Sequence, residues 1–202
     1  HYWSNKIPFF KGDKLDGFIG VSTDISEVVR LKNEFRELAR IDVLTGVLTR
    51  RFLLKHTELE LKRAQRRGTR IALLLIDIDQ FKAINDTYGH AFGDAFLITV
   101  VEACQKNARE SDLIGRLGGD EFVITIDDAD AEGMASAAER FQEAVQSASM
   151  ITPDGVEISL SISMGAALSA PESSVDSLLA AADDALYEAK EAGRNCWRMT
   201  VP

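Results

Sequence analysis

The run of residues 71–78 constrains the fold of this chain more than any other stretch. Residues 71–76 form its longest unbroken apolar run, and Asp77, Ile78 and Asp79 follow. Because the run is almost wholly apolar instead of alternating, it predicts a strand that is buried on both faces. A two-residue period puts the side chains of Asp77 and Asp79 on one side of this strand. A carboxylate at the end of a buried strand is costly unless a cation meets it.

A second constraint lies in residues 113–126, where two apolar, strand-like stretches flank Gly118 and Gly119. Glycine accepts the positive φ angles of a tight primed turn, so the pattern predicts a β-hairpin. The carboxylates of Asp120 and Glu121 follow the turn directly. Taken alone, such a string is weak evidence of a site, and a charged tip that keeps the sheet end soluble explains it better.

Composition limits the class of protein. The 202 residues are 46% hydrophobic, enough for one good core, and the net charge of −9 argues against broad binding to nucleic-acid phosphates. Cys104 and Cys196 have no paired or metal-like spacing, so we expect a reduced, cytoplasmic setting. No apolar run approaches the roughly 18 residues of a membrane span. The chain begins at His1 without a methionine, which leaves open a membrane anchor or sensor region upstream.

The N-terminal residues 1–23 read as a strand, a turn and a second strand. Two strands alone are marginal in water, so they need the rest of a sheet or another partner. Residues 17–26 resemble the last strands and the exit motif of a PAS sensor domain, and the alternative is an arbitrary hairpin. We therefore assign residues 1–23 to a C-terminal PAS fragment.

Residues 24–41 are expected to form a linker helix. Val28, Leu31, Phe35 and Leu38 repeat at spacings of three, four and three, which is the a/d seam of a coiled coil. Two heptads are too few to prove a coiled coil, and a helix that packs on its own domain is the alternative. A helix in this position can join two subunits.

Other stretches also read as regular structure. Helical spacing of apolar residues predicts helices over residues 52–67, 134–145 and 175–189. Residues 158–164 alternate between apolar side chains and serines, which predicts a strand with only one buried face.

Residues 81–94 follow the buried strand as a turn and a helix start, an order in which backbone N–H groups can hold phosphate. Lys82 adds a point charge there. His90 alone is more often a surface histidine than a ligand. Arg109 and Asp112, three residues apart, would on their own be an exposed ion pair that contributes little.

Together these motifs resemble the GGDEF domains of diguanylate cyclases. The resemblance runs from Asp42 to about Trp197, and we assign residues 42–202 to this domain. Val47 and Thr49 depart from the leucine and asparagine that the family usually has. The motifs that carry the resemblance, in order along the chain, are Asp42-x-Leu44-Thr45-Gly46, Asp77-x-Asp79-x-Phe81-Lys82-x-Ile84-Asn85-Asp86-x-x-Gly89-His90-x-x-Gly93-Asp94, Gly118-Gly119-Asp120-Glu121-Phe122 and Leu160-Ser161-Ile162-Ser163-Met164-Gly165.

The resemblance implies an α+β fold, an α/β sandwich like the nucleotidyl cyclase and polymerase palm. Its central sheet is expected to be mostly antiparallel and flanked by helices. The resemblance also implies an enzyme that condenses two GTP molecules to cyclic di-GMP and releases two pyrophosphates. Such an enzyme acts as a homodimer and is inhibited by its product, so GTP and cyclic di-GMP are the expected ligands.

By the same resemblance, Asp77, the backbone carbonyl of Ile78 and Asp120 bind Mg²⁺, or Mn²⁺ in its place. Hard oxygen ligands of this kind suit magnesium. Catalysis is expected to depend on Asp120, Glu121 and Lys82, with Lys82 stabilising charge in the transition state.

The residues implied in substrate binding are Phe81, Asn85, His90, Asp94, Gly118, Gly119, Lys190 and Arg194. A carboxylate such as that of Asp94 can accept both N1–H and the exocyclic amine of guanine, which adenine cannot supply. Arg109 and Asp112 resemble the inhibitory product site of the family, to which Arg140 is expected to add a second arginine. The planar fork of arginine suits guanine O6 and N7.

Two other classes of protein compete with the enzyme. One is a GGDEF-type module that binds GTP or cyclic di-GMP without making it, and the intact acidic and base-reading positions favour the enzyme over it. The other is a template-directed polymerase palm, which the acidic balance and the lack of a thumb-sized remainder disfavour.

Overall fold

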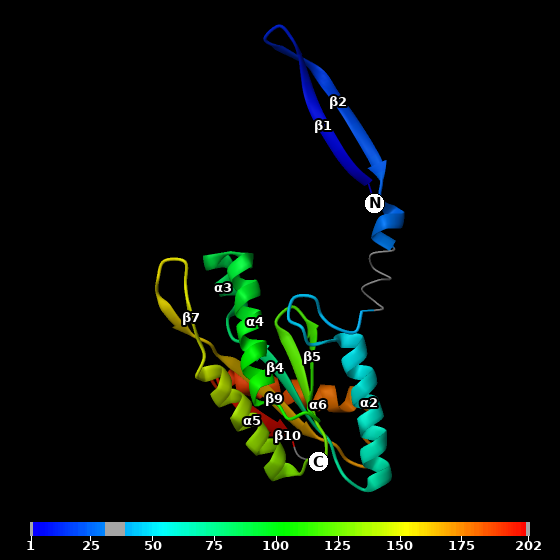
Figure 1. The fold of residues 1–202 in the computed structure, drawn as a ribbon, viewed down its shortest axis with the longest axis vertical. Helices are drawn as coiled ribbons and strands as arrows, with labels where there is room; N and C mark the ends of the chain where they lie inside the picture. The colour runs from blue at the N-terminus through cyan, green and yellow to red at the C-terminus, as the bar shows by residue number, and fades with distance from the viewer. Residues whose placement is uncertain (1, 31–38, 201–202) are drawn as a thin grey trace. The chain divides into compact units, whose positions relative to one another are not determined.

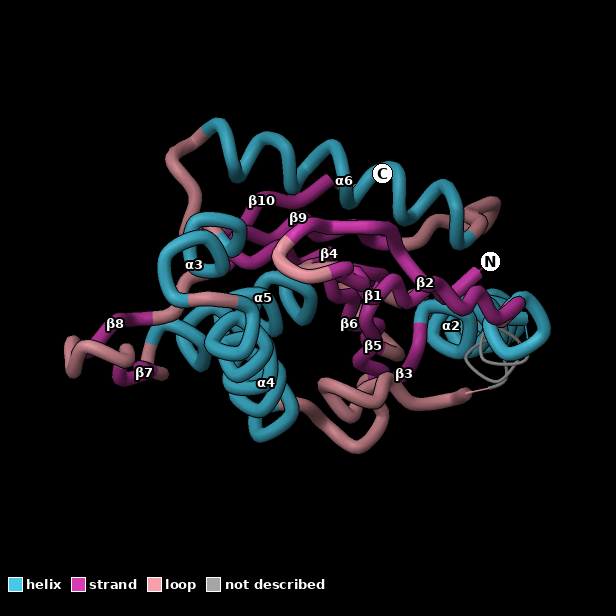
Figure 2. Tube along the Cα trace, turned by 90° about the horizontal axis from the view of Figure 1, so that it is seen from above, coloured by secondary structure: helices cyan, strands magenta, loops and turns pink. Residues whose placement is uncertain are grey.

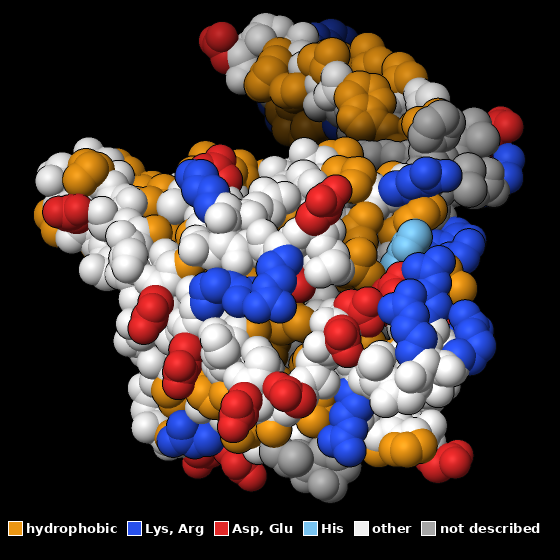
Figure 3. Space-filling model, turned by 60° about the horizontal axis from the view of Figure 1, so that its bottom comes forward, with side chains coloured by type: hydrophobic (Ala, Val, Ile, Leu, Met, Phe, Trp, Pro, Cys, Tyr) orange, Lys and Arg blue, Asp and Glu red, His pale blue; other side chains and the backbone are white. Residues whose placement is uncertain are grey.

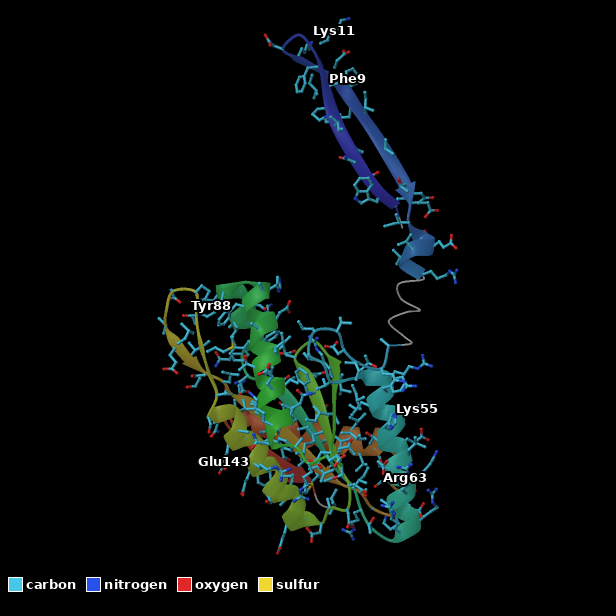
Figure 4. All side chains as sticks on the ribbon, viewed as in Figure 1. Phe9, Lys11, Lys55, Arg63, Tyr88 and Glu143 are labelled. Atoms are coloured by element: carbon cyan, nitrogen blue, oxygen red, sulfur yellow. The ribbon has the colours of Figure 1, made fainter. Side chains whose placement is uncertain are left out.

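The computed structural model describes residues 2–30 and 39–200. The chain divides into two compact units, residues 1–39 and residues 40–202. In the first unit, β1 (Tyr2–Lys11) and β2 (Lys14–Asp24) pair antiparallel, which confirms the expected strand, turn and strand. The ring of Phe9 packs over Gly17, where a Cβ would lie 2.7 Å from the ring (Figure 4).

The hairpin leaves apolar side chains uncovered among the residues that the structure describes. Ile7 and Ile19 pair across the two strands, yet they are 62% and 64% exposed. The chain is helical over residues 26–30, whereas Asp24 ends β2 and Ile41 forms an isolated bridge with Leu48, so the expected helix over residues 24–41 does not include these two ends. Of the predicted seam, only Val28 falls in the described part, whereas Leu31, Phe35 and Leu38 lie outside it.

The second unit is built on a six-stranded sheet (Figure 1). Its order is β10-β9-β4-β6-β5-β3, with antiparallel pairing of β4 to β6 and β9 and of β5 to β6, and parallel pairing at both edges. The expected mostly antiparallel sheet is therefore confirmed. The strands are β3 (Leu48–Thr49), β4 (Ala72–Ile78), β5 (Leu113–Gly118), β6 (Glu121–Ile126), β9 (Ile162–Leu168) and β10 (Trp197–Thr200); a separate small sheet pairs β7 (Ser149–Ile151) with β8 (Glu157–Ser159).

Helices cover both faces of the six-stranded sheet (Figure 2). α4 (His90–Asn107) and α5 (Ala131–Gln146) pack on one face, and α2 (Arg50–Arg67) and α6 (Val175–Glu191) pack on the other. Successive residues of β4 point alternately into these two cores, so the strand is buried on both faces as its apolar run predicts. The short helix α3 (Phe81–Tyr88) joins β4 to α4.

The prediction for residues 158–164 is wrong. Instead of one strand with one buried face, β8 ends at Ser159 and β9 begins at Ile162, and all of β9 is buried. The reason is that β9 lies between β4 and β10, with α5 and α6 packed on its two faces. Gly165 allows the close approach of α6, because a Cβ there would come within 1.9 Å of the carbonyl oxygen of Ala182.

Basic side chains gather on the side of this unit that α2 forms (Figure 3). Several of them pair within the helix, as Lys62 does with Glu58 at 2.6 Å. Pairs of this kind within a helix explain the basic run, and no ligand is needed to account for it. Because they are exposed, they contribute little to stability. Among the helices that the structure describes, none has the length and apolar character that crossing a membrane requires.

Candidate active site

Acidic residues from two strands meet at one end of the central sheet. The antiparallel register of β4 and β6 pairs Asp77 with Glu121, and Asp120 precedes Glu121 in the hairpin turn. Gly119 opens this turn with a φ of 53°, a conformation that glycine adopts without strain. The pairing therefore brings the end of the buried strand next to the Gly-Gly hairpin, as the sequence predicted.

Asp77 meets a cation from the opposite end of the chain. The ammonium of Lys190, in the last turn of α6, lies 2.8 Å from Asp77 Oδ2. Burial raises the pKa of Asp77 above its ordinary value; the Lys190 ammonium opposes this effect, and the charges of Asp120 and Asp79 reinforce it. Burial is the largest of these effects, and the neighbouring carboxylates add to it.

These groups fit a hard divalent cation. The net excess of negative charge and the oxygen donors of Asp77, Ile78 and Asp120 match what magnesium prefers. Within residues 2–30 and 39–200, no three acidic, histidine or cysteine side chains cluster as metal ligands. Magnesium usually takes one or two carboxylates and completes its shell with water and substrate phosphates.

Asp79 is engaged elsewhere. It is 6% exposed, and its two carboxylate oxygens accept hydrogen bonds from Ser163 Oγ at 2.7 Å and from the N–H of Asn195 at 3.0 Å. Its partners are therefore structural, on β9 and in the turn after α6. Arg194, the expected triphosphate contact, stands next to Asn195 in that turn and is exposed.

Arg116, for which the sequence predicted no role, holds the hairpin tip in place. Its guanidinium donates from Nε and Nη2 to the carbonyl of Gly119 at 2.9 and 2.6 Å, and from Nη1 to Asp42 Oδ1 at 3.2 Å. It also lies over the ring of Phe122, 5.9 Å from the centroid. The sequence did contain a signal for this role, because Arg116 is a cation inside an otherwise apolar strand, two residues before the glycines.

Asp42 closes this brace at the start of the domain. Its Oδ1 also accepts hydrogen bonds from the backbone N–H and the hydroxyl of Thr45, at 2.9 and 2.7 Å. Burial opposes ionisation of Asp42, but the Thr45 hydrogen bonds and the charge of Arg116 outweigh it and hold its pKa below the ordinary value. The Asp-x-Leu-Thr-Gly motif thereby connects to the acidic hairpin.

The helix pair α3 and α4 brings together the residues expected to read the base. A Cβ at Gly93 would lie 1.9 Å from Asn85 Oδ1, so only glycine lets the Asn85 amide sit against α4, beside Asp94. Lys82, His90 and Asp94 are exposed. These polar groups are therefore open to a ligand on one helical surface.

Two aromatic residues fix the ends of α3. Phe81, at its start, is half-buried and packs against the core that α4 and α5 share. Tyr88, at its end (Figure 4), packs on Phe92 of α4 with ring centroids 5.1 Å apart. Phe81 thus has a packing role in addition to its expected contact with substrate.

Arg109, Asp112 and Arg140 meet away from the carboxylates. Asp112 Oδ2 accepts a hydrogen bond from the N–H of Arg109 at 2.8 Å and lies 3.5 Å from Arg140 Nη2. The Asp112 side chain is fully buried, and its Oδ1 has no hydrogen-bond partner in the described part of the chain. Arg109 and Asp112 line a cavity of about 490 Å³ that also borders the turn at Gly46. The bare surface ion pair is therefore the wrong explanation of this motif.

The chain belongs to the GGDEF family. Residues 39–196 match the family described as "Diguanylate cyclase, GGDEF domain", which confirms the resemblance seen in the motifs. Diguanylate cyclase DosC of Escherichia coli K12 is 40% identical over 180 residues, which cover 87% of this chain and 39% of DosC. The chain thus spans about two fifths of that relative.

Solved structures agree with the fold. Diguanylate cyclase SiaD from Pseudomonas aeruginosa, solved in complex with its activator SiaC, superposes with a TM-score of 0.76 at 28% identity and covers 88% of this chain and 72% of its own. The GGDEF domain of DgcB from Caulobacter crescentus, solved in complex with c-di-GMP, gives a TM-score of 0.75 at 30% identity, over 80% of this chain and 92% of its own.

The charge of Asp42 should stabilise the fold in a pH-dependent way. The variant Asp42→Asn keeps the shape of the side chain but removes its charge. Because the folded-state pKa of Asp42 is lowered, its charge contributes stability above the unfolded pKa of about 3.9, and this is lost as the pH falls through the folded value.

We expect the parent to be more stable than Asp42→Asn at neutral pH and the difference to vanish in strong acid. Denaturant unfolding of both proteins across a pH series measures it. A difference that stays constant with pH would contradict the role given to the charge.

Proposed function

We propose that this chain condenses two GTP molecules to cyclic di-GMP with release of two pyrophosphates. The observation that carries the proposal is the juxtaposition of Asp77 and Asp120 beside the Gly-Gly turn. Joining a 3′-hydroxyl to an α-phosphate needs positioning and charge neutralisation more than covalent help from the protein. Two acidic side chains that repel each other at a sheet edge suit that demand.

In this proposal, Asp77, the Ile78 carbonyl and Asp120 hold Mg²⁺ or Mn²⁺, with Glu121 next to them. The bound metal supplies charge neutralisation at the phosphate and activates the attacking hydroxyl. Lys82, in the first turn of α3, stabilises the negative charge that develops on the phosphate.

The triphosphate is proposed to lie over the hairpin turn. Gly118 and Gly119 carry no side chains that would keep phosphate oxygens from the backbone N–H groups. Lys190 and Arg194 approach from the end of α6, and the short distance from Lys190 to Asp77 supports their position at this edge. Lys190 can then serve either the carboxylate or a phosphate oxygen.

Guanine is proposed to lie against α3 and α4. Asp94 accepts N1–H and the exocyclic amine, Asn85 donates and accepts at the same edge, and His90 and Phe81 border the nucleotide. The close approach of Asn85 to Gly93 supports this arrangement, because it fixes the amide beside Asp94.

Cyclic di-GMP is proposed to inhibit by binding at Arg109, Asp112 and Arg140. The cavity that Arg109 and Asp112 line supports this site. The GGDEF domain of DgcB was solved in complex with c-di-GMP, which supports binding of the product by a domain of this fold.

The active form is proposed to be a homodimer. One domain holds one GTP, whereas the product joins two nucleotides by reciprocal bonds, so two sites that face each other across a two-fold axis suit the reaction. The expected helix over residues 24–41 would raise the effective concentration of the two domains. Residues 1–23 would be the end of a PAS domain that feeds this helix.

Asp120→Asn should abolish turnover while leaving the fold intact, because it removes one of the charges that face the metal. We expect the rate of pyrophosphate release from GTP and magnesium to fall by about a hundredfold or more. Asp184→Asn, at an exposed carboxylate of α6, is the matched control and should keep the parental rate.

Near-parental turnover by folded Asp120→Asn would contradict the metal assignment. If the parent itself, as a demonstrated dimer, released no pyrophosphate but still bound GTP or cyclic di-GMP, the non-catalytic module would replace the enzyme as the function.

Arg109→Ala should relieve inhibition by added cyclic di-GMP, because the arginine fork no longer meets guanine O6 and N7. We expect the product to slow the parent and to have at least tenfold less effect on the variant, by the usual weight of one bidentate contact. The control variant Arg63→Ala removes one positive charge at a different position, on α2, and should leave the inhibition unchanged. Equal inhibition of Arg109→Ala and the parent would show that this motif does not bind the product.

A further inference from the structure

The turn between α6 and β10 holds an unusual backbone conformation. Gly193, Arg194 and Asn195 have successive φ angles of 109°, 64° and 49°. Glycine tolerates a positive φ and asparagine often does, but arginine gains nothing from it. Left-handed conformations of this kind persist at functional positions only where surrounding contacts impose them.

The backbone N–H of Arg194 donates to the carbonyl of Ala189 at 3.1 Å, and Asn195 makes further contacts that hold the turn. Its backbone N–H donates to Asp79 Oδ2 at 3.0 Å. Its side-chain Oδ1 accepts hydrogen bonds from Nε2 of Gln142 and Nε2 of Gln146, both at 3.0 Å. Gln142 is only 7% exposed and donates also to the carbonyl of Ile162, 3.1 Å away. Asn195 is thereby fixed from β4, from α5 and through α5 from β9.

The same contacts connect the turn to the end of the sheet where Asp77 lies. Asp79 lies two residues after Asp77, and Ser163 Oγ holds its other oxygen at 2.7 Å. Lys190, in the last turn of α6, pairs with Asp77 at 2.8 Å. The end of β4 and the end of α6 are therefore tied twice, once on each side of Arg194.

We propose that Asn195 is a positioning residue, which locks the left-handed turn and so holds Arg194 toward the triphosphate beside Asp77. This inference rests on the proposed function, in which Arg194 contacts the phosphates, and it adds the residues that keep the arginine there. Gln142 acts one step further out, by holding the Asn195 side chain.

We expect a loss of affinity only for nucleotides that carry the outer phosphates. Asn195→Ala loses the acceptor for both glutamines and replaces asparagine by a residue that tolerates the left-handed conformation less well, so the turn spends most of its time in other geometries. The apparent affinity for a ligand falls in proportion to the fraction of protein that is in the binding-competent state. We expect the affinity for a non-hydrolysable GTP analogue to fall about tenfold, and that for GMP, which lacks the outer phosphates, to stay unchanged.

Three further variants separate the causes. Gln142→Met removes the buried donor and should reduce the same preference for triphosphate. Asn195→Gly accepts the positive φ without strain but lacks the acceptor for the glutamines, so it should recover only part of what alanine loses. Gln65→Met is the matched control: Gln65 Nε2 donates to the carbonyls of Pro171 and Ser173 at the other end of α6, and its loss should leave the preference intact.

Amide hydrogen exchange without nucleotide gives a second measurement. We expect residues 193–196 to exchange faster in Asn195→Ala and Gln142→Met than in the parent, while β4 and β9 keep their protection. Unchanged exchange in the turn, an equal fall in affinity for GMP, or full recovery in Asn195→Gly would each overturn the inference. A parent that prefers the GTP analogue to GMP but releases no pyrophosphate would contradict the proposed turnover alone, and the same comparison would still decide the role of Asn195.

Discussion

The antiparallel pairing of β4 with β6 is the constraint on which the rest of this domain depends. It joins a strand with apolar side chains buried on both faces to a hairpin that turns at Gly119, so Asp77 and Asp120 meet where the sheet ends. Their mutual repulsion would be costly at a half-buried edge. Lys190 offsets part of it, and the excess of negative charge is what a divalent cation can use.

Contacts from distant parts of the chain hold this edge in shape. Arg116 ties the hairpin tip to Asp42 at the start of the domain, and Asp79 ties the end of β4 to Asn195 near its end. Both contacts use charged groups whose hydrogen bonds are stronger than neutral ones, which suits a site that must keep its geometry under electrostatic repulsion.

Local patterns predicted much of this arrangement, because periodicity and turn chemistry are local properties. The apolar run of β4 was sufficient to predict a buried strand, and the glycines of the hairpin were sufficient to predict its turn. The ordered motifs were sufficient to predict the family. The Arg116–Asp42 and Asn195–Asp79 contacts join residues 74 and 116 positions apart, and no local pattern reports such pairing. The serines around β9 misled for the same reason: its burial comes from neighbouring strands and helices.

Two copies of this site are proposed to work together on two GTP molecules. The most direct test is the initial rate of pyrophosphate release per subunit from GTP and magnesium, measured across protein concentration together with the oligomeric state. We expect a rate per subunit that rises with concentration and levels off as the dimer saturates. A rate per subunit that is the same for monomer and dimer would contradict it.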